Sequence, residues 1–330
     1  MNDEQLYRRW QEMFSELITE IRDKFEPQLI YESSLPTFFR EKIERVDGTD
    51  SIEPGLTRLE WLPDLPPGVE WPQHEGRAMD FVAQINLSDL EAGFHPLLPG
   101  SGWLYFFVGD FWDQNVIPHR VFYYDGPVTE LVRTSPPPNL EPPEMMNKDF
   151  GLINFRPGFS LNPNFLDGIN SWSFNHDPAK EPLRDLKFPL YGECQPEISR
   201  IGGYMYAFQG GGWDRDALLY LNGFEALIRH GYFHVSPLFR DENAKEQYYR
   251  RIYEGIVNAG DLQNFEQQAE KYGEIHDELE KHTEPIEILF GLESAMGRCW
   301  VDVGFLQFFI RQDDLANRNF ERTYCDIIST

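Results

Sequence analysis

Two similar aromatic segments, far apart in the chain, constrain its fold more than any other sequence feature. Residues 102–108 read Gly-Trp-Leu-Tyr-Phe-Phe-Val, and residues 304–310 read Gly-Phe-Leu-Gln-Phe-Phe-Ile. Short runs of aromatic and branched residues that begin at a glycine are typical of buried β-strands. The recurrence of one such run with nearly the same pattern predicts that a supersecondary unit occurs twice.

Two further pairs of segments precede these runs in the same order. Residues 81–85 align with residues 288–292, and residues 57–59 align with residues 199–201. Three matches in one order indicate an internal duplication more specifically than a single match does. The predicted pseudo-repeats are residues 57–133 and 199–325.

Helical periodicity is found at the N-terminus and in the second half of the chain. Over residues 3–25 the apolar side chains recur at three- and four-residue steps, which predicts an amphipathic helix. Pro27 bars its continuation, and residues 33–36 are expected to form the loop beyond it. The same periodicity predicts a helical insertion at residues 214–283. The predicted domains are an N-terminal helical segment packed on the body, residues 1–50, and a domain of residues 51–330 that contains both pseudo-repeats.

Charge excludes several classes of partner. The 330 residues include 29 basic and 55 acidic side chains, which gives a net charge of −26. A polyanion would be repelled at long range, so nucleic acid and anionic membranes are not expected as partners. A basic protein would be attracted. Acidity that only aids solubility is the alternative reading, and it stays open.

The chain is expected to be a cytoplasmic protein. No stretch approaches the uninterrupted apolar length of a membrane helix, and residues 1–4 lack the basic and apolar character of a secretion signal. The three cysteines, Cys194, Cys299 and Cys325, are too few and too far apart for a disulfide framework or a zinc site. They are expected to be ordinary buried thiols.

An ordered set of motifs resembles the YwqG-like family, a bacterial family of unknown function. The set includes Leu-Pro-Pro-Gly-Val-Glu-Trp-Pro at residues 65–72, Phe-Val-Ala-Gln-Ile at residues 81–85, the aromatic run that ends at Phe107, and Trp-Val-Asp-Val-Gly at residues 300–304. The resemblance extends over residues 57–320. It implies an α+β fold dominated by antiparallel sheets, and it implies no established reaction.

The chain departs from this family pattern at two places. Leu-Glu-Trp-Leu at residues 59–62 stands where the first half of the family pattern has a glycine pair, whereas the second half keeps Gly202 and Gly203. The helical insertion that follows Gln209 is also longer than in the family pattern. A binding role for the first of these turns is therefore left open.

No motif for catalysis or for metal binding is found. Ser101 lies between two adjacent glycines, which is not the spacing of a nucleophile elbow. His230 and His234 have the spacing of a helical zinc pair, but Gly231 interrupts the helix and no glutamate follows His230. A catalytic role is therefore disfavoured, and neither a cofactor nor a metal is predicted.

Polar residues within apolar strands are the remaining candidates for a site. Gln84 and Asp302 occupy comparable positions, one in each half. A buried polar side chain needs a partner, so these residues either connect the halves structurally or line a cleft between them. The candidate ligand-binding residues are Trp71, Gln84, Arg200, Gln209 and Asp302.

The leading hypothesis is a non-catalytic acidic interaction protein that binds or neutralises a basic partner, such as a toxin domain. The predicted contact face includes Glu274, Asp277, Glu278 and Glu280. The alternative is a small-molecule-binding protein or a hydrolase that uses a cleft near Gln84, Arg200 and Asp302. The sequence does not specify an oligomeric state.

Overall fold

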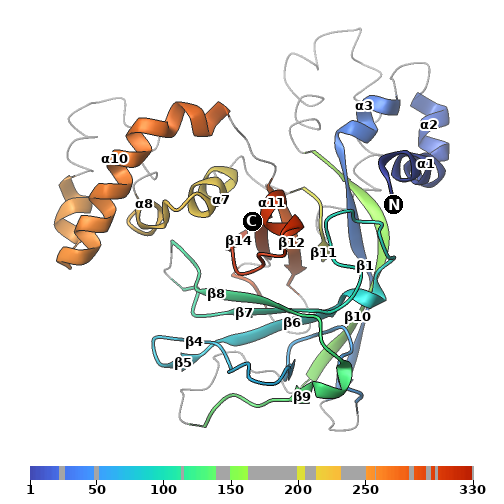
Figure 1. Cartoon of the computed structure of the whole chain (residues 1–330), viewed down its shortest axis with the longest axis horizontal. Helices are drawn as coiled ribbons and strands as arrows, with labels where there is room; N and C mark the ends of the chain where they lie inside the picture. Colours follow the sequence, from blue (N-terminus) through green and yellow to red (C-terminus); the bar gives the residue numbers. More distant parts are fainter. Residues whose placement is uncertain are drawn as a thin grey trace.

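The computed structural model describes most of the chain (Figure 1). The described residues are 1–21, 27–47, 52–112, 115–138, 149–162, 199–204, 213–231, 250–256, 258–281, 286–294, 299–301 and 304–328.

Ten strands within these ranges form one antiparallel sheet. In sheet order they are β14 (Thr323–Ile328), β13 (Phe305–Arg311), β12 (Ile286–Glu293), β11 (Arg200–Ile201), β1 (Ser34–Asp47), β10 (Asp149–Leu161), β2 (Arg58–Leu59), β6 (Asp80–Asn86), β7 (Trp103–Val108) and β8 (His119–Tyr124). Two short ribbons accompany the sheet: β3 (Asp64–Leu65) pairs with β9 (Val132–Arg133), and β4 (Gln73–His74) pairs with β5 (Arg77–Ala78). Helices and a large antiparallel sheet make this an α+β protein.

The long hairpin of β1 and β10 lies at the centre of the sheet. Its register runs from Ser34 opposite Leu161 to Asp47 opposite Asp149. Four strands lie on each side of it; we call β2, β6, β7 and β8 the first flank, and β11, β12, β13 and β14 the second flank. The sheet curls until its outer strands approach each other (Figure 1), and His119 Nε2 of β8 lies 2.9 Å from the Thr323 carbonyl oxygen of β14.

The place of β1 differs from the sequence prediction. Residues 33–36 were expected to form a loop and residues 1–50 to form a helical segment, but β1 begins at Ser34 and contains Pro36. A strand was not predicted here because the alternation of apolar and polar residues typical of a strand is weak. Lys42 and Glu44, for example, are both exposed and pair with each other. The strand is defined by its partners β10 and β11, which no local pattern reveals.

The N-terminal periodicity corresponds to two helices, α1 (Asp3–Met13) and α2 (Ser15–Ile21), and α3 (Pro27–Glu32) follows them. Asn2 and Gln5 form a capping box at the start of α1, which satisfies two free N–H groups. The break lies at Phe14, the C-cap of α1. The buried face of these helices packs on the central hairpin, with the rings of Phe14 and Phe159 6.3 Å apart.

Three helices of the second half, α7 (Trp213–Leu221), α8 (Glu225–Arg229) and α10 (Ala259–Lys281), lie within the predicted insertion. Figure 1 shows α10 and α8 projecting away from the sheet. The short helix α11 (Gln312–Ala316) follows β13, and the 3-10 helices η1 (Leu87–Asp89) and η2 (Val128–Glu130) lie in the first half. None of the helices in the described ranges is both long and apolar enough to cross a bilayer.

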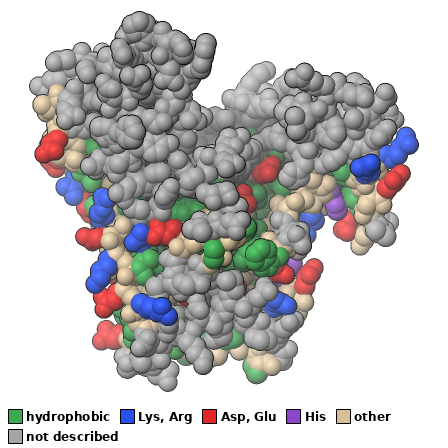
Figure 2. Space-filling view, turned by 180° about the vertical axis from the view of Figure 1, so that it is seen from behind, with side chains coloured by type: hydrophobic (Ala, Val, Ile, Leu, Met, Phe, Trp, Pro, Cys, Tyr) green, Lys and Arg blue, Asp and Glu red, His purple; other side chains and the backbone are tan. Residues whose placement is uncertain are grey.

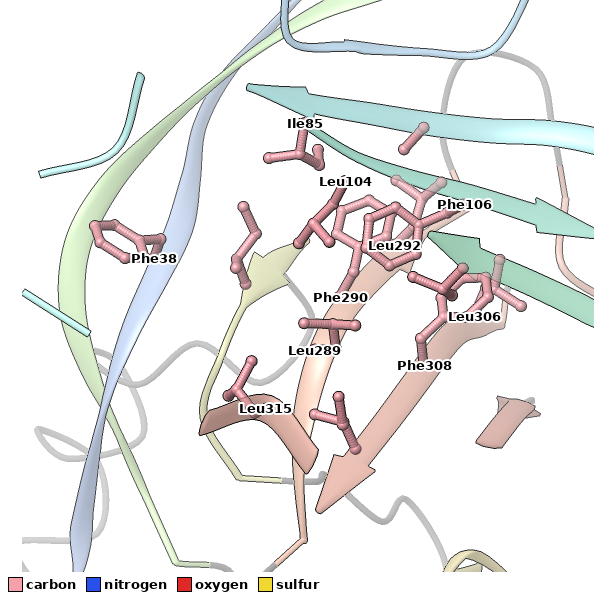
Figure 3. Packing of buried hydrophobic residues seen from close by; sticks show 14 of the residues in the cluster. Phe38, Ile85, Leu104, Phe106, Leu289, Phe290, Leu292, Leu306, Phe308 and Leu315 are labelled. Carbon is pink, nitrogen blue, oxygen red and sulfur yellow. The ribbon is translucent and has the colours of Figure 1, made fainter. Parts of the chain in front are cut away.

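The concave face of the curled sheet encloses the main hydrophobic core (Figure 3). Phe106 of the first flank meets two rings of the second flank, with ring centroids 4.8 Å from Phe290 and 5.0 Å from Phe308. Each of these side chains is fully buried, and burial of a phenylalanine contributes roughly 1.5–3 kcal/mol. The two flanks therefore share one core.

The two flanks also share details of strand register. A β-bulge lies between Phe81 and Ala83 where β6 pairs with β7, and another lies between Ile288 and Phe290 where β12 pairs with β13. Beyond the bulges, Leu104 faces Ile85 just as Leu306 faces Leu292. These strands contain the segments that align with each other in the sequence, residues 81–85 with residues 288–292 and residues 102–108 with residues 304–310.

Candidate functional site

A row of buried polar side chains crosses the first flank. Arg58 of β2 faces Gln84 of β6, which in turn faces Tyr105 of β7. All three are fully buried, yet their chain neighbours Leu59, Ala83 and Leu104 belong to the main core. Because successive strand side chains point to opposite faces, the row lies on the convex face of the sheet.

Asp64 of β3 is the centre of this row. Its carboxylate lies 2.9 Å from Arg58 Nη2 and 3.0 Å from Arg133 Nε, and it accepts a hydrogen bond from the Gly55 N–H at 2.9 Å. Gln84 accepts a hydrogen bond from the Asp64 N–H at 2.8 Å, and the Tyr105 hydroxyl donates to the Asp64 carbonyl at 2.7 Å. The row therefore fastens the β3 ribbon to the sheet.

The charges of this cluster do not cancel. Burial lowers the pKa of Arg58, although the Asp64 carboxylate opposes that shift. Burial raises the pKa of Asp64, but Arg58 and the Gly55 N–H outweigh it and hold that pKa below its usual value. Two guanidinium groups thus face one carboxylate. Among the described residues, Arg58 Nε and Nη1 have no hydrogen-bond partner, so the cluster retains donors for an anion.

The turn after β2 holds two residues in the left-handed region, Glu60 at φ 61° and Trp61 at φ 64°. Both lie within residues 59–62, where the family resemblance led us to expect a glycine pair. In the second flank, Gly202 and Gly203 have φ values of 76° and 93°. The first turn thus keeps a glycine-like backbone with bulky residues, at a cost of roughly 1–2 kcal/mol per residue. The Arg133 guanidinium lies 5.0 Å from the Trp61 ring centroid, which links this turn to the charge cluster.

A corresponding row on the second flank has different chemistry. Arg200 faces Gly291, Gly291 faces Gln307, and Gln307 faces Asp326. Gln307 is 0% exposed, and both polar atoms of its amide lack a hydrogen-bond partner within the described part of the chain. Burial, with a contribution from Asp216, raises the pKa of Asp326 to about 7.

Arg200 itself is buried against aromatic rings. Its guanidinium carbon lies 5.6 Å from the ring centroid of Phe305 and 5.9 Å from that of Phe39. Cation–π contact of this kind contributes about 0.5–2 kcal/mol, and the charge of Arg200 also opposes the rise that burial causes in the pKa of Glu293.

A buried pair of His95 and Glu287 was not predicted from the sequence. His95 Nε2 lies 2.9 Å from Glu287 Oε2, and both residues are buried. A Cβ on Gly202 would lie 2.8 Å from His95 Cδ2, so the glycine permits this close approach. No local pattern signals the pair, because its members come from opposite halves of the chain.

The predicted ligand-binding residues are only partly brought together. Trp71 packs against Phe107 in the apolar cluster of the first flank, with ring centroids 5.5 Å apart, and its indole N–H donates to the Met79 carbonyl at 2.9 Å. Gln84 lies in the adjacent polar row. Arg200 lies on the second flank, separated from Gln84 by β1, β10 and β2 in the sheet order. Gln209 and Asp302 lie outside the described residues, as does His234.

A small pocket of about 210 Å³ lies beside the β4–β5 ribbon. Its lining includes His74, Glu75, Arg77 and Asp110. None of the predicted site residues lines it, and its volume is below the usual range for a ligand site. Within the described ranges, no three His, Cys, Asp or Glu side chains are gathered as ligands for a metal ion.

Fold and site together define a class: an α+β protein built on one curled antiparallel sheet. Each flank carries a row of residues that begins at a buried arginine. The chain belongs to the family described as a domain of unknown function (DUF1963), whose model matches residues 57–327. No curated protein matches the chain.

Proposed function

We propose that this chain is a non-catalytic interaction protein that binds a basic macromolecular partner through an acidic face of α10. The observation that carries the proposal is a stripe of three exposed glutamates, Glu266, Glu270 and Glu274, spaced four residues apart. No ion pair joins any of them to another described residue. Like charges at this spacing cost a helix about 0.2–0.5 kcal/mol per pair. A cationic partner would offset this repulsion. A helix with only a structural role would gain nothing from keeping the repulsion.

The packing of α10 keeps this stripe turned outward. Phe265 is fully buried in a cluster with Leu227 and Phe224, while Lys271 lies over the Phe224 ring at 5.3 Å. On the face shown in Figure 2, acidic and basic side chains of the described residues are interspersed. A run of like charges along the projecting helix α10 is thus a feature of that helix and not of the whole surface shown. The side chains of Asp277, Glu278 and Glu280, which were predicted to belong to the same contact face, lie outside the described part of the chain.

The net charge of −26 supports a lysine- or arginine-rich partner such as a toxin domain, because charge of this size steers oppositely charged proteins together. The same proposal includes a cytoplasmic location and membership of the YwqG-like branch. It also includes an origin of the two flanks by duplication, which the matching bulges and registers support.

The test compares two variants of equal net charge. One carries Glu266→Gln, Glu270→Gln and Glu274→Gln; the control carries Glu41→Gln, Glu53→Gln and Glu70→Gln, three exposed glutamates outside α10. Each is used to capture proteins from a native lysate at about 50 mM salt, where screening is weak. Captured proteins are identified by mass spectrometry.

We expect the wild-type and control chains to retain the same basic partner and the α10 variant to lose it. Raising the salt to about 500 mM should slow association more than dissociation. An acidic partner, or equal loss by both variants, contradicts the assignment to α10.

A second candidate function is the binding of a small anion at the cluster of Arg58, Asp64 and Arg133. It rests on the two unpartnered donor atoms of Arg58 described above and on the excess of one guanidinium. A carboxylate or a phosphate fits this chemistry, since both accept paired N–H donors. This candidate gives a specific site and ligand class to the alternative of a small-molecule-binding protein. The site lies within the first flank and needs no contact between the flanks.

Thermal unfolding in phosphate, acetate or chloride at equal ionic strength tests this second function. We expect phosphate or acetate to raise the melting temperature of the wild-type chain, and Arg133→Gln to abolish the rise. Arg120→Gln, which removes an exposed arginine of β8, is the control and should keep the rise. Equal melting temperatures in all three salts contradict anion binding.

A further inference from the structure

A buried carboxylate in β12 has one oxygen without a partner. Glu287 is 0% exposed, and its Oε2 lies 2.9 Å from Nε2 of His95. The other oxygen, Oε1, is also buried and has no hydrogen-bond partner among the described residues. Within the same ranges, His95 is the one residue that pairs with Glu287. A carboxylate that is removed from water normally has both oxygens satisfied, so Oε1 needs an explanation.

The hydrogen bonds of His95 determine the charge of this pair. The backbone N–H of Leu97 donates to Nδ1 of His95 at 3.4 Å, so that nitrogen presents a lone pair. The proton of the neutral imidazole then lies on Nε2, which donates it in the bond to Glu287. A neutral imidazole and an ionised carboxylate carry one negative charge between them. A buried charge without a counterion is strongly unfavourable, so the pair lacks one positive charge.

The glycine turn of the second flank connects Glu287 with the surface. The Gly203 carbonyl accepts a hydrogen bond at 2.9 Å from the N–H of Ile288, the residue after Glu287. Tyr204 follows the turn directly. Burial raises the pKa of Tyr204; a hydrogen bond with Asn162 opposes the rise, and the charge of Glu287 adds to it. Because Tyr204 is partly exposed, the polar surroundings of Glu287 reach the surface there.

Aromatic rings lie on the other side of His95. Phe94, the preceding residue, is fully buried, and its ring centroid lies 5.4 Å from that of Phe38 and 5.2 Å from that of Phe159. Aromatic faces attract organic cations as well as apolar groups. A metal ion such as calcium instead prefers several oxygen ligands. A single carboxylate next to an aromatic cluster therefore suits an organic cation.

We propose that Glu287 and His95 form a binding site for a small organic cation with an ammonium group, an alkylamine in its protonated form. The ammonium N–H groups donate to Oε1 of Glu287, and the alkyl part packs toward Phe94. Because the position is enclosed, the ligand is small. The net charge of −26 concentrates such cations around the chain. This site is independent of the α10 stripe and of the anion site at Arg58.

Nuclear Overhauser measurements locate the ligand directly. The probe is carbon-labelled methylammonium, the smallest alkylammonium ion, added to the full chain. We expect contacts between its methyl protons and the ring protons of His95 and Phe94. Contacts with exposed acidic residues alone, or no contacts, overturn the proposal.

Thermal unfolding in three chloride salts at equal ionic strength measures the effect on stability. Methylammonium should raise the melting temperature of the wild-type chain by about 2 °C or more relative to sodium, since a ligand of the folded state stabilises it. Tetramethylammonium has no N–H donor and should give no such rise. Equal melting temperatures in methylammonium and sodium contradict the site.

A set of variants assigns the effect to Glu287. Glu287→Gln keeps the shape of the side chain and removes its charge, and it should abolish both the contacts and the rise. Glu41→Gln, at an exposed position of β1, is the matched control and should keep both. Arg133→Gln should also keep both, which separates this site from the anion site. A rise that persists in Glu287→Gln overturns the proposal; if that variant fails to fold, the contacts in the wild-type chain decide.

Nitrogen NMR of the His95 ring at neutral pH checks the charge of the pair. We expect one protonated ring nitrogen, Nε2, in the chain without methylammonium. A ring protonated on both nitrogens would itself supply the counterion of Glu287, and that result would overturn the proposal.

Discussion

The two flanks of the sheet place a buried arginine at matching positions and surround it differently. On the first flank, Arg58 meets the carboxylate of Asp64, and Gln84 and Tyr105 hold the backbone of the same residue. On the second flank, the position that corresponds to Gln84 is occupied by Gly291, and that of Tyr105 by Gln307, whose amide has no partner in the described ranges. Similar strand registers can therefore support either a fastened polar network or an unsatisfied one.

This difference separates structural from functional roles. A fully partnered network contributes stability, whereas an unsatisfied buried group costs free energy and needs another explanation. Gln84 belongs to the first kind, because its amide also donates to the Leu56 carbonyl at 3.0 Å. The structural interpretation of Gln84 is accordingly favoured over a role in lining a cleft. The unpartnered donors of Arg58 are the exception within the first flank.

Removal of the Asp64 carboxylate should produce the largest effect. Asp64→Asn leaves the guanidinium of Arg58 buried without a counterion, which costs roughly 3–5 kcal/mol. Urea unfolding should show this loss as a lower midpoint. The control is Asp314→Asn, which removes a carboxylate paired with the partly exposed Arg322 and Arg311, and which should cost less. Similar losses in both variants contradict the special burial of the Asp64 cluster.

A matched pair of glutamine substitutions should give the next largest effect. Gln84→Met leaves the Asp64 N–H and the Leu56 carbonyl without their partner, at a cost of about 1–3 kcal/mol. Gln307→Met removes an amide that has no partner among the described residues and preserves much of its volume, so the stability should remain the same or rise. Unfolding free energies of the two variants measure this contrast directly. Equal losses would mean that the two rows are alike.

The same comparison shows how far the sequence predicts the structure. The strands at residues 81–85, 103–108 and 305–310 were predictable because each is a compact apolar run with turn residues at its ends. The burial of Gln84 was predictable for the same reason, because a single polar residue within a buried apolar run is buried with it.

Other features depend on distant segments and carry no local signal. Arg133 reaches Asp64 from a different part of the chain, and Glu287 reaches His95 from the opposite half. The left-handed turn at Glu60 and Trp61 was also unpredictable, because neither residue favours that backbone; only the family resemblance marked the position. The central strand β1 depends on its partners in the same way.

The smallest expected change in stability concerns pH. The two rows should respond to pH with opposite signs. Burial raises the pKa of Asp326 to about 7, so the folded chain holds a proton that the unfolded chain releases near its ordinary value of 3.8. The contribution of Asp326 is therefore complete below that ordinary value and is lost as the pH rises through about 7. Asp64 behaves oppositely, because its pKa is lowered: its contribution is present at neutral pH and is lost as the pH falls below 3.8.

Asp326→Asn tests this opposition, because asparagine resembles the protonated carboxyl group. The stability of the variant minus that of the wild-type chain should rise between pH 4 and pH 8 by roughly 1 kcal/mol, since partial exposure to water reduces the effect of the shifted pKa. Asp125→Asn, at an exposed turn, should give a flat difference over the same range. A flat difference for Asp326→Asn as well would place Asp326 in water rather than beside the unpartnered Gln307. The second row would then lose its titrating group, and the contrast between the flanks would rest on Gln307 alone.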